Sequence, residues 1–354
     1  MAGVENSDRG GRPAEAGALR ILCAGISVVD EVFHVENFPP PDGKAAAKGF
    51  FVVNGGCAAN AAITVARLGG RAALAGPMGS DANGDFVLAA LAREPVDCTG
   101  CQRVPGAATA LSVVFINARG ERTIVTYRDE SVAAVVPPDP EGLAAAADVV
   151  LADNWYPVFV QPICEAARRR GLRIVLDADK PSLVDDPLFR ICTHVVFSSE
   201  CLRATTGCAD LAEGLRRVAP HTHSFLAVSH GPNDILFLEG TSVRRVPVFA
   251  IHAVDTVGAG DALHGAFALA LAEGRGEAEG LRFAAAVAGL KCTRMGGSVG
   301  LPTRAEVEAF ITEYDGQGDP LAPEALMGRG LIWNNFLSTL VLPRHIEIIL
   351  SGRA

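Results

Sequence analysis

Unbroken apolar runs recur along the chain, and helical patterns separate most of them. The runs are Arg20–Val29, Ala72–Ala75, Asp148–Ala152, Arg173–Leu176, Val195–Phe197 and Phe225–Val228, with helical patterns at Ala58–Leu68, Phe86–Arg93, Val158–Arg169 and Asp210–Val218. A strand without polar alternation is buried on both faces, which is typical of a parallel sheet. Strands that alternate with helices need right-handed crossovers. The sequence therefore predicts an α/β fold: a doubly wound, mostly parallel sheet with helices on both faces.

Two segments interrupt this alternation. Residues of about 31–53 and 108–127 contain short strand-like runs with polar interruptions and no helix between them. The second segment has a turn at Asn117–Arg122 and reads as a β-hairpin. We expect these pieces to pair as a small inserted β-sheet that acts as a lid.

The ends of the chain differ in composition from the middle. The first eighteen residues are polar and without periodicity, and they are predicted to be a disordered leader (1–18). The main domain is expected over 19–315. A linker-like stretch and an apolar tail follow over 316–354, an extension whose role the sequence does not indicate.

Charge and cysteine usage exclude several classes of protein. The chain of 354 residues has 31 Lys and Arg against 40 Asp and Glu, a net charge of −9, so a nucleic-acid partner is not expected. It has no apolar run of about 18 residues, so no membrane span is expected. The nine cysteines are scattered through apolar stretches. They are expected to be buried thiols in a reducing compartment, which predicts a cytoplasmic protein.

A glycine-rich turn from Asp255 to Ala262 carries the sharpest chemical signal. Gly258, Ala259 and Gly260 precede an Ala-rich helical pattern. Unpaired N–H groups at a helix start favour a bound anion, and Asp261 would lie beside it. The alternative is that Asp261 only caps the helix.

Together with an earlier motif, this turn resembles the ribokinase-like, or PfkB, family of carbohydrate kinases. Asp-Thr-x-Gly-Ala-Gly-Asp is the second signature of that family, and the first stands at Gly55-Gly56-Cys57-Ala58-Ala59-Asn60. The resemblance covers roughly Arg20 to Tyr314. It implies an enzyme, a phosphotransferase that uses ATP to phosphorylate a hydroxyl of a monosaccharide.

The resemblance assigns roles to residues of both motifs. Asp261 corresponds to the catalytic base, and Gly258, Ala259 and Gly260 to an anion hole for the transferred phosphoryl group. The implied sugar-binding residues are Asp30, Gly55, Gly56 and Asn60. Asp30 is expected at the carboxyl end of the first strand, where ligands bind in open α/β sheets.

The same resemblance implies the cofactors ATP and Mg²⁺. Ser199, Glu200, Ser229, Gly231 and Thr256 correspond to the nucleotide-binding positions, and Glu200 would hold Mg²⁺ through water. For Glu200, a solvated glutamate at a helix start is an equally good interpretation. The resemblance also implies a monovalent cation, K⁺, near Asp255 and Val257.

Within the family, several strings are most similar to ketohexokinase-like members and 6-deoxy-6-sulfofructose kinases; they include GISVVDEVFHVENFP and GLKCTRMGGSVGLP. Lys44 matches a lid lysine of the sulfofructose enzymes, but their arginine after the central strand is missing from segment 152–157. Because that guanidinium would pair with a sulfonate or phosphate, a neutral, ketose-like sugar is favoured, although Arg128 or Lys44 could substitute. Asn154 is a candidate contact to a sugar hydroxyl.

The sequence is also compatible with two other functions on the same fold, and it argues against a third. A nucleoside kinase of the same superfamily would need aromatic residues around the base, and Phe33, Phe50 and Phe51 lie in the lid segments. A non-catalytic sugar-binding regulator would be free to lose Asp261. The Gly-x-Ser-x-Gly string at Gly296–Gly300 lacks the strand–turn–helix context of a hydrolase. A lid with exposed strand edges also predicts a homodimer.

Overall fold

The computed structural model describes residues 19–119 and 121–316, and it divides the chain into two units, Met1–Phe310 and Ile311–Ala354. The first unit holds both sheets. The predicted leader, 1–18, lies outside the described residues, as does the predicted extension beyond Gly316. The boundaries 19–315 for the main domain therefore stay a prediction.

In the part of the chain that the structure describes, nine strands form the main sheet, and the seven from β11 to β5 run parallel to one another. In spatial order they are β13 (Ser242–Val246), β12 (Asn233–Glu239), β11 (Phe225–His230), β10 (His194–Ser198), β9 (Arg173–Ala178), β8 (Val149–Asp153), β1 (Arg20–Ala24), β4 (Arg71–Gly79) and β5 (Val96–Val104). Each apolar run of the sequence contributes to one of these strands. The mostly parallel sheet is confirmed.

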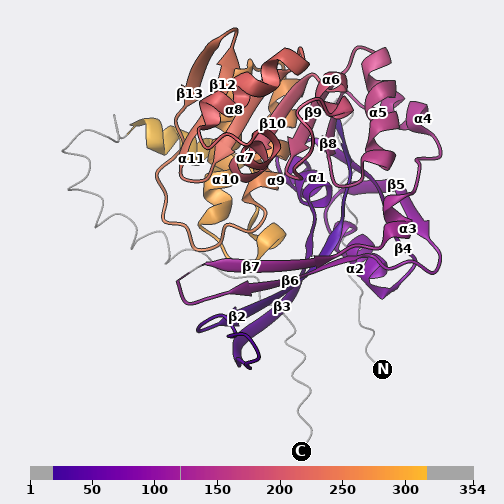
Figure 1. Ribbon diagram of the computed structural model, residues 1–354, viewed down its shortest axis with the longest axis vertical. Helices are drawn as coiled ribbons and strands as arrows, with labels where there is room; N and C mark the ends of the chain where they lie inside the picture. Colours follow the sequence, from indigo (N-terminus) through magenta and orange to yellow (C-terminus); the bar gives the residue numbers. More distant parts are fainter. Residues whose placement is uncertain (1–18, 120, 317–354) are drawn as a thin grey trace, which may run out of the picture. The chain divides into compact units, whose positions relative to one another are not determined.

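Helices cover both faces of this sheet (Figure 1). In β1, Leu22 and Ala24 belong to one apolar cluster with Phe159 and Val160 of α5. Because side chains alternate along a strand, the neighbouring positions of β1 point to the other face, where α1 and α9 pack. The helices are α1 (Cys57–Arg67), α2 (Ala82–Leu91), α3 (Glu130–Ala133), α4 (Pro140–Ala145), α5 (Pro157–Arg169), α6 (Pro187–Ile191), α7 (Ser199–Thr206), α8 (Leu211–Val218), α9 (Ala259–Ala272), α10 (Glu277–Cys292) and α11 (Arg304–Gly316), with short 3₁₀ turns η1 (Ala219–His221) and η2 (Gly297–Gly300).

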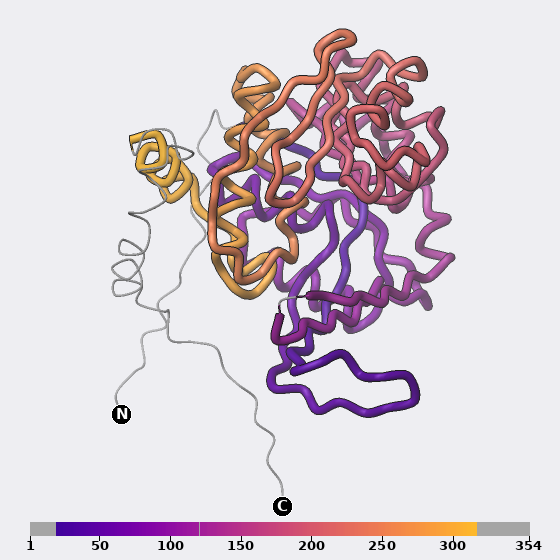
Figure 2. Tube along the Cα trace, turned by 60° about the vertical axis from the view of Figure 1, so that its left-hand side comes forward, coloured from indigo at the N-terminus to yellow at the C-terminus, as the bar shows by residue number. Residues whose placement is uncertain are grey.

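The inserted segments form a second sheet of four strands, as the sequence predicts (Figure 1). Its order is β3 (Ala47–Gly55), β2 (Val28–Val35), β6 (Ala110–Ile116) and β7 (Arg122–Tyr127). β2 and β6 follow the carboxyl ends of β1 and β5, so the second sheet grows from the edge of the main sheet where parallel strands end. The loop between β2 and β3 extends away from the rest of this sheet (Figure 2).

The first apolar run is not one strand, contrary to the prediction for Arg20–Val29. β1 ends at Ala24, and Val28 begins β2 in the other sheet. The chain turns at Gly25, whose φ is 150° and where a Cβ atom would lie 2.0 Å from the Asp153 carboxylate. The Ile26 N–H donates to that carboxylate at 2.7 Å instead of to a strand. Asp30 therefore lies inside β2, not at the end of the first strand.

Close packing of α1 on α9 brings distant parts of the chain together. At Gly265 of α9, an added Cβ atom would lie 2.7 Å from the Ala61 carbonyl oxygen of α1. Only glycine allows the two backbones to approach this closely. As a result, Asn60 on α1 faces the first turn of α9.

Candidate functional site

The turn before α9 presents backbone donors at the start of a long helix. Gly258 has a φ of 77°, and α9 begins at Ala259. The Ala259 N–H donates to the Thr256 carbonyl at 3.3 Å, a long hydrogen bond. The N–H groups of Gly258 and Gly260 have no partner within the part of the chain that is described. Such groups bind anions, so this turn can act as an anion hole in which Ala259 is already partly engaged.

Asp261 stands directly beside these donors, in the first turn of α9. Its Oδ2 atom accepts a hydrogen bond from the Asn60 amide at 2.7 Å, across 201 residues of sequence. Burial raises the pKa of Asp261, Asn60 opposes the shift, and repulsion from Asp179 adds to it. Among the residues that the structure describes, the Asn60 Oδ1 atom has no hydrogen-bond partner. A raised pKa suits a group that takes a proton near neutral pH, and the free Oδ1 atom can accept a hydroxyl.

Asp30 lies against the first motif. A Cβ atom at Gly55 would be 2.0 Å from the Asp30 Oδ2 atom, so the carboxyl group touches the end of β3 just before Gly56. Burial, followed by repulsion from Asp261, raises the pKa of Asp30 to about 6, while a hydrogen bond from Ser112 opposes this. The structure thus brings together Asp30, Gly55, Gly56, Asn60 and Asp261.

Several residues of this cluster were missed in the sequence. Asp153 and Asp177 stand at or near the carboxyl ends of β8 and β9, and both are buried. The Cys57 sulfur and carboxylate oxygens of Asp177 and Asp261 all lie within 4.8 Å of one another. His264 Nδ1 lies 2.7 Å from the Gly260 carbonyl and 3.3 Å from Asp177 Oδ2. The signal was present, because acidic residues that end buried parallel strands line a ligand-binding edge.

The predicted nucleotide-binding residues lie along the same edge. Ser229 of β11 is level with Ser198 of β10 in the parallel register, so Ser199 and Glu200 lie near it. Glu200 is exposed in the first turn of α7. Gly231 follows β11 with a φ of 53°. Their roles in nucleotide binding stay predictions.

Two predicted sugar contacts are placed elsewhere. Both ends of the Asn154 amide are hydrogen-bonded to the Lys180 backbone: Nδ2 donates to the carbonyl at 2.6 Å, and Oδ1 accepts from the N–H at 2.9 Å. It therefore anchors the chain after β9 and is not free for a hydroxyl. Lys44 is exposed in the β2–β3 loop (Figure 2), and within residues 19–119 and 121–316 it makes no hydrogen bond or ion pair with Asp30 or Asp261. Arg128 instead stacks on Trp155, 4.2 Å from the ring centroid.

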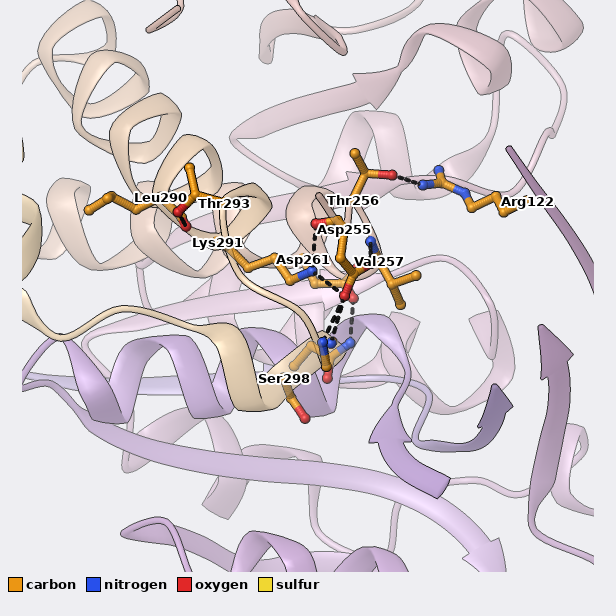
Figure 3. A network of polar contacts seen from close by, with 12 residues as sticks. Arg122, Asp255, Thr256, Val257, Asp261, Leu290, Lys291, Thr293 and Ser298 are labelled. Carbon is orange, nitrogen blue, oxygen red and sulfur yellow. Dashed lines mark hydrogen bonds and ion pairs between the residues drawn. The ribbon is translucent and has the colours of Figure 1, made fainter. Parts of the chain in front are cut away.

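The oxygens of Asp255 are engaged by groups of the protein (Figure 3). Asp255 Oδ1 accepts from the Val257 N–H at 2.9 Å, and Oδ2 from Gly296 and Gly297 at 3.0 Å each. The ammonium of Lys291 lies 3.1 Å from Oδ2 and 2.9 Å from the Asp255 carbonyl. The residues around Asp255 and Val257 therefore do not fit the expected monovalent cation, because a lysine already provides the positive charge.

Comparison with known proteins places this geometry in a family. Residues 18–304 match the model of the pfkB family of carbohydrate kinases. The chain is 25% identical to the ribokinase of Haemophilus influenzae, over 82% of this chain and 98% of that protein. A protein provisionally classed as a ribokinase from Agrobacterium tumefaciens has a similar structure (TM-score 0.80, 34% identity, 84% of this chain and 99% of that one). A fructokinase of Xylella fastidiosa solved with bound ATP has a TM-score of 0.69 at 26% identity, with 84% and 99% covered.

We expect the Asp153→Asn variant to change how stability depends on pH. Burial raises the pKa of Asp153 to about 7, against hydrogen bonds from Ile26 and Trp155, and in an unfolded chain it is about 3.9. The folded state thus binds a proton that the unfolded state releases. This stabilisation is fully present below about pH 4 and is lost as pH rises through about 7.

Urea unfolding tests this expectation. The free energy of unfolding of the wild type minus that of Asp153→Asn should be greater at about pH 5.5 than at about pH 8, by about 2 kcal/mol. The exposed Asp85, in the first turn of α2, gives a control variant, Asp85→Asn, without this change. An equal difference at both pH values would contradict the assignment.

Proposed function

This chain belongs to the pfkB family of carbohydrate kinases, and we propose that it transfers the γ-phosphoryl group of ATP to a hydroxyl of a neutral, ketose-like monosaccharide. The observation that carries the proposal is the Asp261 carboxyl, held by Asn60 at 2.7 Å beside the N–H groups that begin α9. A base next to an anion hole is the minimum that phosphoryl transfer to a hydroxyl requires.

In the proposed reaction, Asp261 accepts the proton of the sugar hydroxyl as its oxygen attacks the γ-phosphorus. The bond from that phosphorus to the bridging oxygen breaks, and ADP leaves with the electron pair. The N–H groups of Gly258 and Gly260, with Ala259, would stabilise charge on the phosphoryl oxygens. Asp30, Gly55, Gly56 and Asn60 would orient the sugar.

The nucleotide is proposed to lie over the carboxyl ends of β10 and β11, on Ser199, Ser229, Gly231 and Thr256. The Xylella fastidiosa fructokinase with bound ATP supports this choice of nucleotide. Carboxylate oxygens on this edge suit Mg²⁺, a hard cation. Glu200 would hold it through water, and when bound it would neutralise charge on the phosphates.

The Asp261→Asn variant tests the base. Asn keeps the shape and cannot accept the proton, so kcat should fall by about 10²–10⁴-fold while calorimetric affinities for ATP and sugar change little. Asp85→Asn, in the first turn of α2, is the matched control and should keep wild-type kcat. More than about a tenth of wild-type kcat in Asp261→Asn would show that another group is the base. A non-catalytic regulator would bind sugar with no turnover in the wild type itself.

A neutral sugar is favoured over an anionic one because carboxyl groups dominate the cluster. Burial and mutual repulsion already raise the pKa values of Asp30, Asp153, Asp177 and Asp261, so a sulfonate or phosphate placed among them would add to the repulsion on every ionised carboxylate. Lys44, from the β2–β3 loop, is exposed. A likeness to ketohexokinase-like members is consistent with this choice.

ATP consumption against hexoses, ketoses, sulfosugars and nucleosides tests this preference. On the preferred ketose, Lys44→Met should change kcat/KM by less than about twofold, as expected for an exposed charge. If an anionic sugar is the substrate, Lys44→Met or Arg128→Met should cost about tenfold to a hundredfold. Activity on a sulfosugar well above fructose would overturn the neutral-sugar proposal, and a preferred nucleoside would overturn the sugar itself.

The aromatic residues of the lid favour a different role from nucleoside binding. Phe33 packs on Phe50 and Phe115, with ring centroids 4.7 and 5.7 Å away. By strand alternation these rings lie on the face opposite Asp30. Phe50 is 54% and Val125 64% exposed on this outer face. We propose that a second copy of the chain covers it, as a homodimer through the lid.

Light scattering after size-exclusion chromatography tests the dimer. Val125→Glu should convert dimers to monomers at micromolar concentration, because it buries a charge in the contact. Leu183→Glu places the same change at an exposed residue outside the lid and should leave the mass unchanged. A monomeric wild type would contradict the proposal.

None of the helices in the described part of the chain combines the length and the hydropathy that a membrane span requires. All nine cysteines are free thiols, which is consistent with the cytoplasmic location that we propose from the sequence. Cell fractionation with an antibody against the native protein would test that location.

A further inference from the structure

Lys291 is a fully buried lysine that the proposed chemistry does not use. It lies in the last turn of α10 and is 0% exposed. We infer that its ammonium serves as a permanent monovalent cation beneath the catalytic turn, so that turnover needs no free K⁺ there. The inference rests on the proposed function for its catalytic part, and on the geometry of Asp255 for its binding part.

The contacts of Lys291 are those that a bound cation would make. Its Nζ atom lies 2.9 Å from the Asp255 carbonyl oxygen and 3.1 Å from the Oδ2 atom of the same residue (Figure 3). Asp255 is itself buried, 6% exposed. A buried carboxylate needs a compensating charge, and here the charge is covalently attached. A free cation brought to the same oxygens would be repelled by the ammonium.

The pair is connected to the anion hole through the backbone. Asp255 Oδ1 accepts a hydrogen bond from the N–H of Val257, one residue before Gly258. Asp255 Oδ2 accepts hydrogen bonds from the N–H groups of Gly296 and Gly297, at the start of η2. Although burial alone would raise the pKa of Asp255, the Gly297 N–H, Lys291 and the Val257 N–H keep it below its usual value. Asp255 thus stays ionised and keeps the turn tied to α10 and η2. Lys291 is a positioning residue for the donors at Gly258 and Gly260.

The network around Asp255 and Lys291 also extends to the carboxyl end of β3 in the second sheet. Ser298 of η2 donates its hydroxyl to the Asn54 carbonyl of β3 at 3.1 Å. Asn54 directly precedes Gly55, which lies against the Asp30 carboxyl group. A change in the Lys291–Asp255 pair should therefore disturb the phosphoryl-binding turn first and the sugar-binding residues less.

The wild type gives the first test. Its kcat should agree within about twofold in KCl, NaCl and tetramethylammonium chloride at equal ionic strength, because exposed charges alone respond to the salt. Its melting temperature should likewise not depend on which cation is present. An increase of about tenfold in kcat with K⁺ would overturn the inference.

Variants of Lys291 give the second test. Lys291→Met keeps the length of the side chain and removes the charge, so kcat should fall at least about tenfold, as for a lost charged hydrogen bond, with KM for the sugar within about threefold. Lys48→Met, at an exposed lysine paired with Glu36, is the control and should behave as the wild type. A Lys291→Met variant with unchanged kcat would overturn the inference.

Rescue distinguishes a cation site from a purely structural lysine. In Lys291→Ala, K⁺ or ethylammonium should restore kcat at least about tenfold and raise the melting temperature, and tetramethylammonium, too large for the space, should do neither. If single variants do not fold, the double variant Asp255→Asn/Lys291→Met removes both charges together; it should fold but keep a low kcat. A double variant with wild-type kcat would overturn the inference.

The melting temperatures separate this inference from the proposed function. If no sugar or nucleoside is phosphorylated by the wild type, the proposed function fails, and kcat can no longer be read. Stabilisation of Lys291→Ala by K⁺, absent in the wild type, would still support Lys291 as the resident cation. Equal effects of K⁺ on the wild type and Lys291→Ala would overturn it.

Discussion

The hydrogen bond between Asn60 and Asp261 depends on how closely α1 approaches α9. Gly265 lets the two helix backbones meet where an added Cβ atom would lie 2.7 Å from the Ala61 carbonyl. Through this contact, two motifs 201 residues apart place an amide 2.7 Å from a carboxylate. The helix start of α9, with its unpaired N–H groups, is fixed in the same step. The proposed base Asp261, its partner Asn60 and the proposed anion donors are therefore all positioned by the contact between α1 and α9.

Carboxyl groups gathered at the edge of a parallel sheet come with an electrostatic cost. Burial and mutual repulsion raise the pKa of Asp30 to about 6 and that of Asp153 to about 7, and they raise the pKa values of Asp177 and Asp261. At the proposed sugar end such a cluster disfavours anions, whereas at the proposed phosphoryl end the N–H groups at the start of α9 favour them. The two ends thus have opposite preferences for charge, which would set the orientation in which a sugar and a phosphate group bind.

Local motifs in the sequence were enough to predict the alternating fold, the inserted sheet and the glycine-rich turn before α9, because each depends on short-range backbone chemistry. Contacts between distant side chains were not predictable in this way. The apolar run at Arg20–Val29 reads as one strand, and only the Asp153 carboxylate against Gly25 shows why it breaks. The sequence likewise presents Asn154 as available to a sugar hydroxyl, whereas in the structure both ends of its amide are hydrogen-bonded to the Lys180 backbone. Lys291, a charged residue in an Ala-rich helix, gave no sign that it pairs with Asp255.

A crystal structure of the protein with a non-hydrolysable ATP analogue and the preferred sugar would test the central claim most directly. The claim predicts that the acceptor hydroxyl lies about 2.6–3.2 Å from an Asp261 oxygen and in line with the γ-phosphorus. The γ-phosphate oxygens should accept hydrogen bonds from the N–H groups of Gly258 and Gly260. A hydroxyl that instead faces Asp30 or Asp177, with Asp261 remote from the phosphorus, would contradict the account.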